Sequence, residues 1–185
     1  MKPILDIIKP IELLKGSHAD TGTTGRGCFL NVIAYLNGEP QITDSSACVC
    51  FVVRPIAIWL NDYLNNDERA RLLPYIMRAM GSASDDPEVF VPRAEAAARF
   101  AHRCSDIAAA SAASAAARGA SVAANAAKAS ARAAMWAARD ASAERKALID
   151  AAFQFLDEAL PSSVEAAPPP VIDRALKLRE LADSR

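Results

Sequence analysis

The amino-acid sequence predicts an all-α protein, in which a compact N-terminal helical domain is followed by an Ala-rich helical hairpin or one long bent helix. Two observations support this fold class. In the first 85 residues, apolar residues recur at helical spacing and the strand signal is weak. Residues 94–160 then contain 30 alanines among 67 positions, and alanine has the highest helix propensity of all residues.

The N-terminal domain, residues 1–85, contains four expected helices whose ends are marked by glycine, proline and asparagine. Pro10 breaks or restarts the first helix, and Gly38 stops the second. Asn66 caps the fourth helix, which Pro74 kinks and Gly81 ends. The first three expected helices cover residues 3–15, 28–37 and about 50–64, with loops at 16–27 and 39–48.

The Ala-rich segment, residues 86–161, begins within a polar connection that covers residues 82–92. Asp86-Pro87 in that connection is a helix-start signal. Gly119 divides the segment into an antiparallel pair if the chain folds back, and Pro161 ends it. Residues 162–185 then form a Pro-rich linker and a short amphipathic helix over about 171–182.

The Ala-rich segment has two distinct faces when it is drawn as a helix. One face consists of methyl groups, from Ala120, Ala123, Ala127, Ala131, Ala134, Ala138 and Ala141. The opposite face carries Arg118, Asn125, Lys128, Arg132, Trp136, Arg139 and Lys146. Two interpretations stay open: a tight helix–helix contact, including a homo-oligomer through the Ala-rich face, or a basic stripe for an acidic partner or a nucleic-acid backbone.

Charge and composition argue against several classes of protein. The formal net charge is −1, so no overall field attracts nucleic acid or an anionic membrane. The sequence has no uncharged apolar run long enough to span a membrane. A signal peptide needs a continuous apolar stretch, and the N-terminal apolar residues are interrupted by Asp6, Lys9 and Glu12. Four cysteines without an export signal indicate reduced thiols, and we therefore expect a cytoplasmic protein.

The candidate site lies at the starts of two expected helices. Cys28 follows Gly27 at a helix N-terminus, where unpaired N–H groups and the helix dipole lower the pKa of a thiol. Cys48 and Cys50 lie at the start of the next long helix. His18 and Asp44 lie in the loops that lead into these helices, so all five groups are expected to meet if the helices pack side by side.

Three interpretations of these residues stay open. In the first, Cys28 is a nucleophile, His18 is its base and Asp44 orients the imidazole. In the second, a zinc ion is bound by His18, Cys28, Cys48 and Cys50. In the third, the cysteines are small buried hydrophobic residues and His18 is a loop residue. The sequence identifies no cofactor.

The loop before Cys28 is rich in glycine and threonine and suggests ligand binding. Gly22, Gly25, Arg26 and Gly27 lead into a helix N-terminus, which is a general anion site. The loop lacks the Gly-Lys-Ser/Thr ending of a phosphate loop, so ordinary loop flexibility is the alternative. The candidate ligand-binding residues are Gly25, Arg26, Gly27, Asn31, Cys48 and Cys50. Farther along, Asn61-Asp62 is expected to end its helix through side-chain to backbone hydrogen bonds.

These residues resemble the N-terminal block of a family of uncharacterised bacterial and bacteriophage proteins. That block contains Gly-Ser-His, Gly-x-Cys, Ala-Tyr-x-x-Gly-Glu, Asp-His-Pro-x-Cys-Val-Cys-Pro and Asn-Asp, and members often carry Ala-rich tails. The matching residues here are Gly16-Ser17-His18, Gly27-Cys28, Ala34-Tyr35, Gly38-Glu39, Asp44, Ala47-Cys48-Val49-Cys50 and Asn61-Asp62, with Trp136-Ala-Ala-Arg139-Asp140 in the tail. The resemblance covers about residues 12–82 and implies a shared fold and site, but no reaction.

The chain departs from that pattern at three places. Asn31 stands where similar proteins have Glu, Ser45-Ser46 replaces His-Pro, and Phe51 replaces Pro. A carboxylate and an imidazole are thus missing, which weakens both the zinc and the enzyme interpretations.

The sequence therefore favours a non-enzymatic ligand- or protein-binding module over an enzyme. Its partner surface is expected at the loop ends near His18, Arg26, Cys28 and Asp44. One alternative is a cysteine-dependent hydrolase or transferase with Cys28 as nucleophile. Another is a structural protein that oligomerises through its Ala-rich helices.

Overall fold

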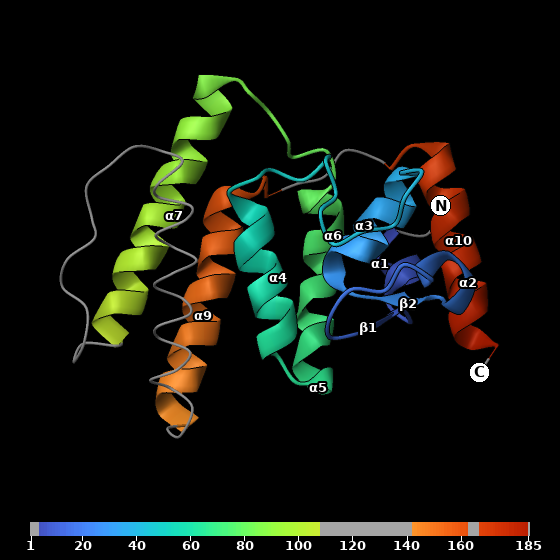
Figure 1. Cartoon of the computed structure of the whole chain (residues 1–185), viewed down its shortest axis with the longest axis horizontal. Coiled ribbons are helices and arrows are strands. Elements are labelled where there is room, and N and C mark those ends of the chain that lie inside the picture. The colour runs from blue at the N-terminus through green and yellow to red at the C-terminus, as the bar shows by residue number, and fades with distance from the viewer. Residues whose placement is uncertain (1–3, 108–141, 163–166, 185) are drawn as a thin grey trace. The chain divides into compact units, whose positions relative to one another are not determined.

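The computed structural model describes residues 4–107, 142–162 and 167–184, and these are predominantly helical (Figure 1). The predicted all-α class is confirmed, since two short strands are the exception among the described residues. The chain forms two compact units. The first contains Met1–Cys50, Ala57–Ala83 and Ser162–Arg185, and the second contains Phe51–Ile56 and Ser84–Pro161. None of the described helices is long and apolar enough to cross a membrane.

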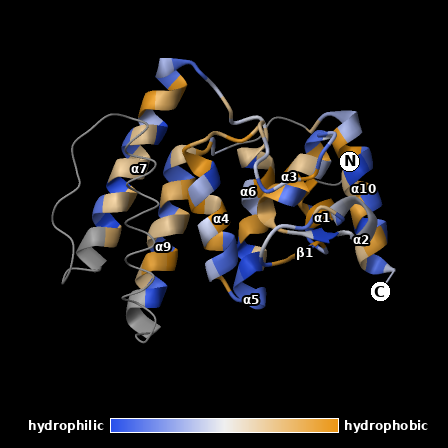
Figure 2. Ribbon diagram, in the orientation of Figure 1, coloured by the Kyte–Doolittle hydropathy of each residue, from blue (hydrophilic) through white to orange (hydrophobic). Residues whose placement is uncertain are grey.

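The first unit combines short helices with one small strand pair. Its helices are α1 (Ile4–Ile8), α2 (Thr21–Thr24), α3 (Phe29–Asn37), the part of α4 (Val53–Tyr63) from Ala57 onward, α5 (Asn66–Arg69), the 3₁₀ helix η1 (Ala70–Leu72), α6 (Leu73–Ala79) and α10 (Pro169–Asp183). Its strands are β1 (Glu12–Leu13) and β2 (Arg26–Gly27). The C-terminal helix α10 packs against α1, α2 and α3, with its hydrophobic residues visible in Figure 2.

Helix α3 lies in the core of the first unit and was predicted with its correct ends. Cys28 is the N-cap, and Gly38 adopts the left-handed conformation that ends the helix. Phe29, Leu30 and Ile33 are fully buried. Burial of each such side chain contributes roughly 1.5–3 kcal/mol, so this helix is a main source of the unit's stability.

The strand pair replaces part of the helix that was predicted over residues 3–15, so that prediction was wrong beyond Ile8. Strands β1 and β2 are parallel, with Glu12 opposite Arg26 and Leu13 opposite Gly27. Pro10 has no N–H to continue a helix. After it, buried Leu13 follows exposed Glu12, which is the two-residue alternation of a strand.

The segment from Asn65 to Gly81 also differs from its prediction in detail. Asn65, and not Asn66, is the N-cap, and it forms a capping box with Glu68. Three short helices replace the single kinked one, and Pro74 lies in the first turn of α6, where its missing N–H costs no hydrogen bond. Gly81 follows α6 with a φ of 75°, consistent with its expected role as a stop.

The second unit is built on α7 (Pro87–Ile107) and α9 (Ser142–Ala159), which run antiparallel and side by side (Figure 1). Helix α7 begins at the predicted Asp86-Pro87 signal, where Asp86 accepts a hydrogen bond from the Glu88 N–H at 3.0 Å. The Phe100 and Phe155 rings pack 5.7 Å apart between the helices. Gly119 and both predicted faces between Arg118 and Ala141 lie outside the described residues.

Candidate functional site

Asn31 is the centre of the polar residues that the sequence singled out. Its side chain is buried, and its Oδ1 accepts hydrogen bonds from the backbone N–H of His18 at 2.7 Å and of Cys28 at 3.3 Å. Its Nδ2 donates to Ser17 Oγ at 3.5 Å. Asn31 thus fastens the Gly-Ser-His loop to the start of α3.

Asn61 and Asp62, in the last turn of α4, also bond distant segments, in addition to their expected place at the end of that helix. Buried Asn61 accepts from the Phe29 N–H at 3.1 Å and donates to the Leu14 carbonyl at 2.9 Å. Asp62 accepts from the Gly16 N–H at 2.8 Å. These partners lie 32 to 47 residues away in the chain. We call Gly16, Ser17, His18, Cys28, Asn31, Asn61 and Asp62 the polar cluster.

Cys28 serves as the N-cap of helix α3. Its Sγ accepts from the Asn31 N–H at 3.5 Å, and the residue is only 5% exposed. Burial raises the pKa of the Cys28 thiol to about 11, although hydrogen bonds from the Asn31 and Leu30 backbone act to lower it. The expected low pKa was therefore wrong, because desolvation outweighs the N–H groups of the helix terminus.

The residues proposed as a catalytic triad come near one another without forming its hydrogen bonds. The His18 ring donates from Nε2 to the Lys15 carbonyl at 2.9 Å, within its own loop. His18 and Cys28 are linked through their backbones, by Asn31. Asp44 is close enough to raise the pKa of Cys28 further, and among these described residues no hydrogen bond joins the three side chains.

Cys48 and Cys50 belong to a separate set of contacts. Cys48 Sγ lies 3.2 Å from Ser46 Oγ, which also bonds Glu39, and burial raises the pKa of the Cys48 thiol. Cys50 is buried, and its N–H donates to Ser82 Oγ at 3.0 Å. The part of the chain that the structure describes has no group of three His, Cys, Asp or Glu placed to hold a metal ion. The structure thus does not bring the predicted zinc ligands together as one metal-binding group; these ligands are His18, Cys28, Cys48 and Cys50.

The glycines before α3 are required for close packing. A Cβ on Gly25, whose φ is 65°, would lie 2.8 Å from Leu181 Cβ of α10. A Cβ on Gly22 would lie 2.8 Å from the Tyr35 ring, and one on Gly27 would collide with Thr21. Loop flexibility is therefore not their role.

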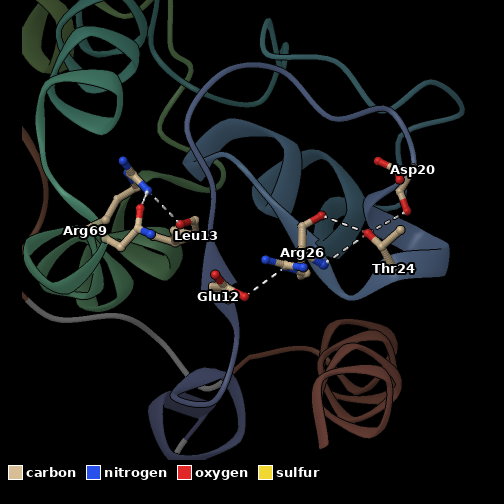
Figure 3. A network of polar contacts seen from close by, with 7 residues as sticks. Glu12, Leu13, Asp20, Thr24, Arg26 and Arg69 are labelled. Carbon is tan, nitrogen blue, oxygen red and sulfur yellow. Dashed lines mark hydrogen bonds and ion pairs between the residues drawn. The ribbon is translucent and has the colours of Figure 1, made fainter. Parts of the chain in front are cut away.

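Several donors at this loop and at the start of α3 are already engaged within the chain. The N–H groups of Cys28, Phe29 and Asn31 already donate within the chain. Arg26 pairs with Glu12 at 2.8 Å, and the Arg26 N–H and carbonyl both contact Thr24 Oγ1 (Figure 3). The candidate ligand-binding residues Gly25, Arg26, Gly27 and Asn31 thus make internal contacts.

Arg69 is a buried cation that the sequence reasoning missed. It is 3% exposed and donates to the carbonyls of Asn61 at 2.7 Å and Leu64 at 2.6 Å. It also donates to the Leu13 carbonyl at 3.2 Å (Figure 3). A fourth bond reaches Asn66 Oδ1 at 2.9 Å. The carbonyls of Asn61 and Leu64 belong to the end of α4, where the helix dipole favours a positive charge. One signal was available: Arg69 lies three and four residues before buried Leu72 and Leu73, on the same helical face.

The second unit carries an exposed apolar surface, which the sequence reasoning also missed. Phe51 is 43% exposed, Val91 48% and Val89 37%. The Phe51 ring stacks on Phe90, with the centroids 5.0 Å apart. We call Phe51, Val89, Phe90 and Val91 the Phe51 patch.

Comparison with family models, curated proteins and solved structures found no match to this chain. The resemblance to uncharacterised bacterial and bacteriophage proteins therefore stays a prediction.

Proposed function

We propose that this chain is a non-enzymatic module that binds another protein. The observation that carries the proposal is the environment of Cys28. The most promising nucleophile is a buried helix cap whose pKa is about 11, and at neutral pH such a thiol is almost entirely protonated and unreactive. In this proposal the polar cluster supports the fold and performs no chemistry.

The proposed binding surface is the Phe51 patch of the second unit. Large apolar side chains that stay exposed together mark interaction sites in soluble domains. Here two aromatic rings are stacked, Phe51 is exposed and Phe90 is half-buried, and the chain neighbours of Phe90, Val89 and Val91, are exposed as well. This differs from the sequence hypothesis, which put the binding surface at His18, Arg26, Cys28 and Asp44. The contacts of His18, Arg26 and Cys28 within the first unit favour a supporting role for these three residues.

We place this function in the cytoplasm. All four cysteines are free, and a reducing compartment keeps thiols in that state.

The proposal is tested by site-specific photocrosslinking in native cells. Benzoylphenylalanine replaces Phe51 in one variant and Leu176 in a matched control, because Leu176 is 42% exposed and belongs to the first unit. We expect one partner protein, identified by mass spectrometry, to crosslink at position 51 and not at 176. Equal crosslinking at both positions would overturn the proposal, and so would crosslinking only to a second copy of the chain.

A further inference from the structure

We propose that the Phe51 patch takes a basic, amphipathic helix of its partner protein. This inference rests on the proposed function and adds the chemistry of the partner. It follows from what surrounds the apolar residues, because the patch alone does not specify a ligand.

The apolar part of the patch provides an anchor of limited size. Phe51 and Phe90 are stacked, with 23° between their ring planes, so the aromatic surface is held in place before binding. Val89 and Val91 are exposed in the first turns of α7, where Figure 2 shows hydrophobic and hydrophilic residues side by side. Such a surface suits a few apolar side chains spaced one helical turn apart.

The border of the patch is acidic. Asp85, Asp86 and Glu88 are all exposed and directly precede or begin α7. The nearest arginines in the sequence, Arg54 and Arg93, are half-buried, and Arg93 donates to the Ala159 carbonyl at 3.0 Å. The fully exposed charges that adjoin the patch in the sequence, Asp85, Asp86 and Glu88, are therefore negative, and the complementary partner carries lysine or arginine next to its apolar residues.

Two other occupants fit less well. A second copy of this chain in a symmetric pair would bring the same acidic border against itself, and like charges would repel. A strand added to a sheet edge needs an exposed strand, and in the second unit the described residues are helical or irregular. A helix with basic flanks is the occupant that both the apolar residues and the carboxylates favour.

The test measures binding of two designed peptides to the full chain by fluorescence anisotropy. One peptide has leucines at helical spacing with lysines between them, and its counterpart has glutamates in place of the lysines. We expect the leucine–lysine peptide to bind and the leucine–glutamate peptide not to bind. Added salt should weaken the binding, because part of the attraction is between charges.

Three variants assign that binding to the patch. Phe51→Ser with Val91→Ser should weaken it at least about tenfold, since central apolar anchors dominate such interfaces. Asp85→Asn with Glu88→Gln should weaken it roughly three- to tenfold and reduce its salt dependence. Leu5→Ser with Leu176→Ser removes equally exposed apolar residues of the first unit and should leave binding unchanged.

The inference is overturned if both peptides bind equally, if Phe51→Ser with Val91→Ser leaves the affinity unchanged, or if the chain self-associates through Phe51. Its failure is distinct from that of the proposed function. A partner that crosslinks at position 51 through an acidic or non-helical segment would refute the basic helix and leave the protein-binding function standing.

Discussion

The polar cluster of the first unit and the Phe51 patch of the second use their side chains in opposite ways. In the polar cluster, Asn31 and Asn61 are buried and bond backbone groups of distant segments. In the patch, aromatic and aliphatic side chains are exposed, with carboxylates beside them. Residue types associated with catalysis thus hold the fold together here, and residue types associated with the core remain on the surface. Burial and bonding decide the role of a side chain more than its chemical type does.

The largest expected effect comes from Arg69, which joins the end of α4 to β1. Arg69→Ala leaves three buried carbonyls without their donor, and we expect the free energy of unfolding to fall by about 3–5 kcal/mol. Urea denaturation followed by circular dichroism measures this. Lys177→Ala, at an exposed position of α10, is the control and should cost no more than about 0.5 kcal/mol.

Asn61 should have the next largest effect. Asn61→Ala leaves the Phe29 N–H and the Leu14 carbonyl unsatisfied, and we expect a loss of about 2–3 kcal/mol in the same denaturation experiment. Asn37→Ala, at an exposed position, should change the stability by less than about 0.5 kcal/mol. Equal effects of the two substitutions would show that the polar cluster does not support the fold.

Cys28 tests the buried state of the polar cluster through the pH dependence of the protein's stability. Its thiol has a pKa of about 11 when folded against 9.0 as the reference value, so the folded chain holds a proton that the unfolded chain releases. The stability from this group is complete below about pH 9 and is lost as the pH rises through 11. In Cys28→Ser, the serine hydroxyl still caps the helix, but the thiol that titrates is absent. Thermal melts from pH 8 to 11 should therefore show the wild type losing roughly 2 kcal/mol more than Cys28→Ser. Parallel curves would contradict the buried-cap assignment.

The patch should give the smallest change in stability. Phe51→Ser with Val91→Ser removes side chains that are 43% and 48% exposed, so we expect less than about 1 kcal/mol of destabilisation. Urea denaturation at neutral pH checks this. A loss as large as that of Asn61→Ala would mean that the patch is part of the core, and the comparison between the two regions would fail.

Local signals in the sequence predicted the helices well. Gly38 ends α3, and Asp86-Pro87 begins α7, because each acts on its own turn of backbone. The loop-end positions also suggested that His18 comes close to Cys28, and Asn31 links the two through their backbones, whereas Asn61-Asp62 was not expected to join them.

Those local signals could not predict contacts between residues that lie far apart in the sequence. Leu13 pairs with Gly27 in a strand and accepts from Arg69, which lies 56 residues away, and neither partner is marked by its neighbours in sequence. The direction of the Cys28 pKa shift was missed for a related reason. A helix N-terminus is visible in sequence, whereas the burial that opposes it depends on how the rest of the chain packs.

The most direct test of the central claim is the alkylation rate of each cysteine in the folded protein. Iodoacetamide at pH 8, followed by peptide mass spectrometry over time, measures all four thiols in one sample. If Cys28 is a structural cap, it should react slowly, as buried Cys104 does, and more slowly than half-buried Cys48. Alkylation of Cys28 faster than both would show an activated thiol, and the chain would then have to be treated as a cysteine-dependent enzyme.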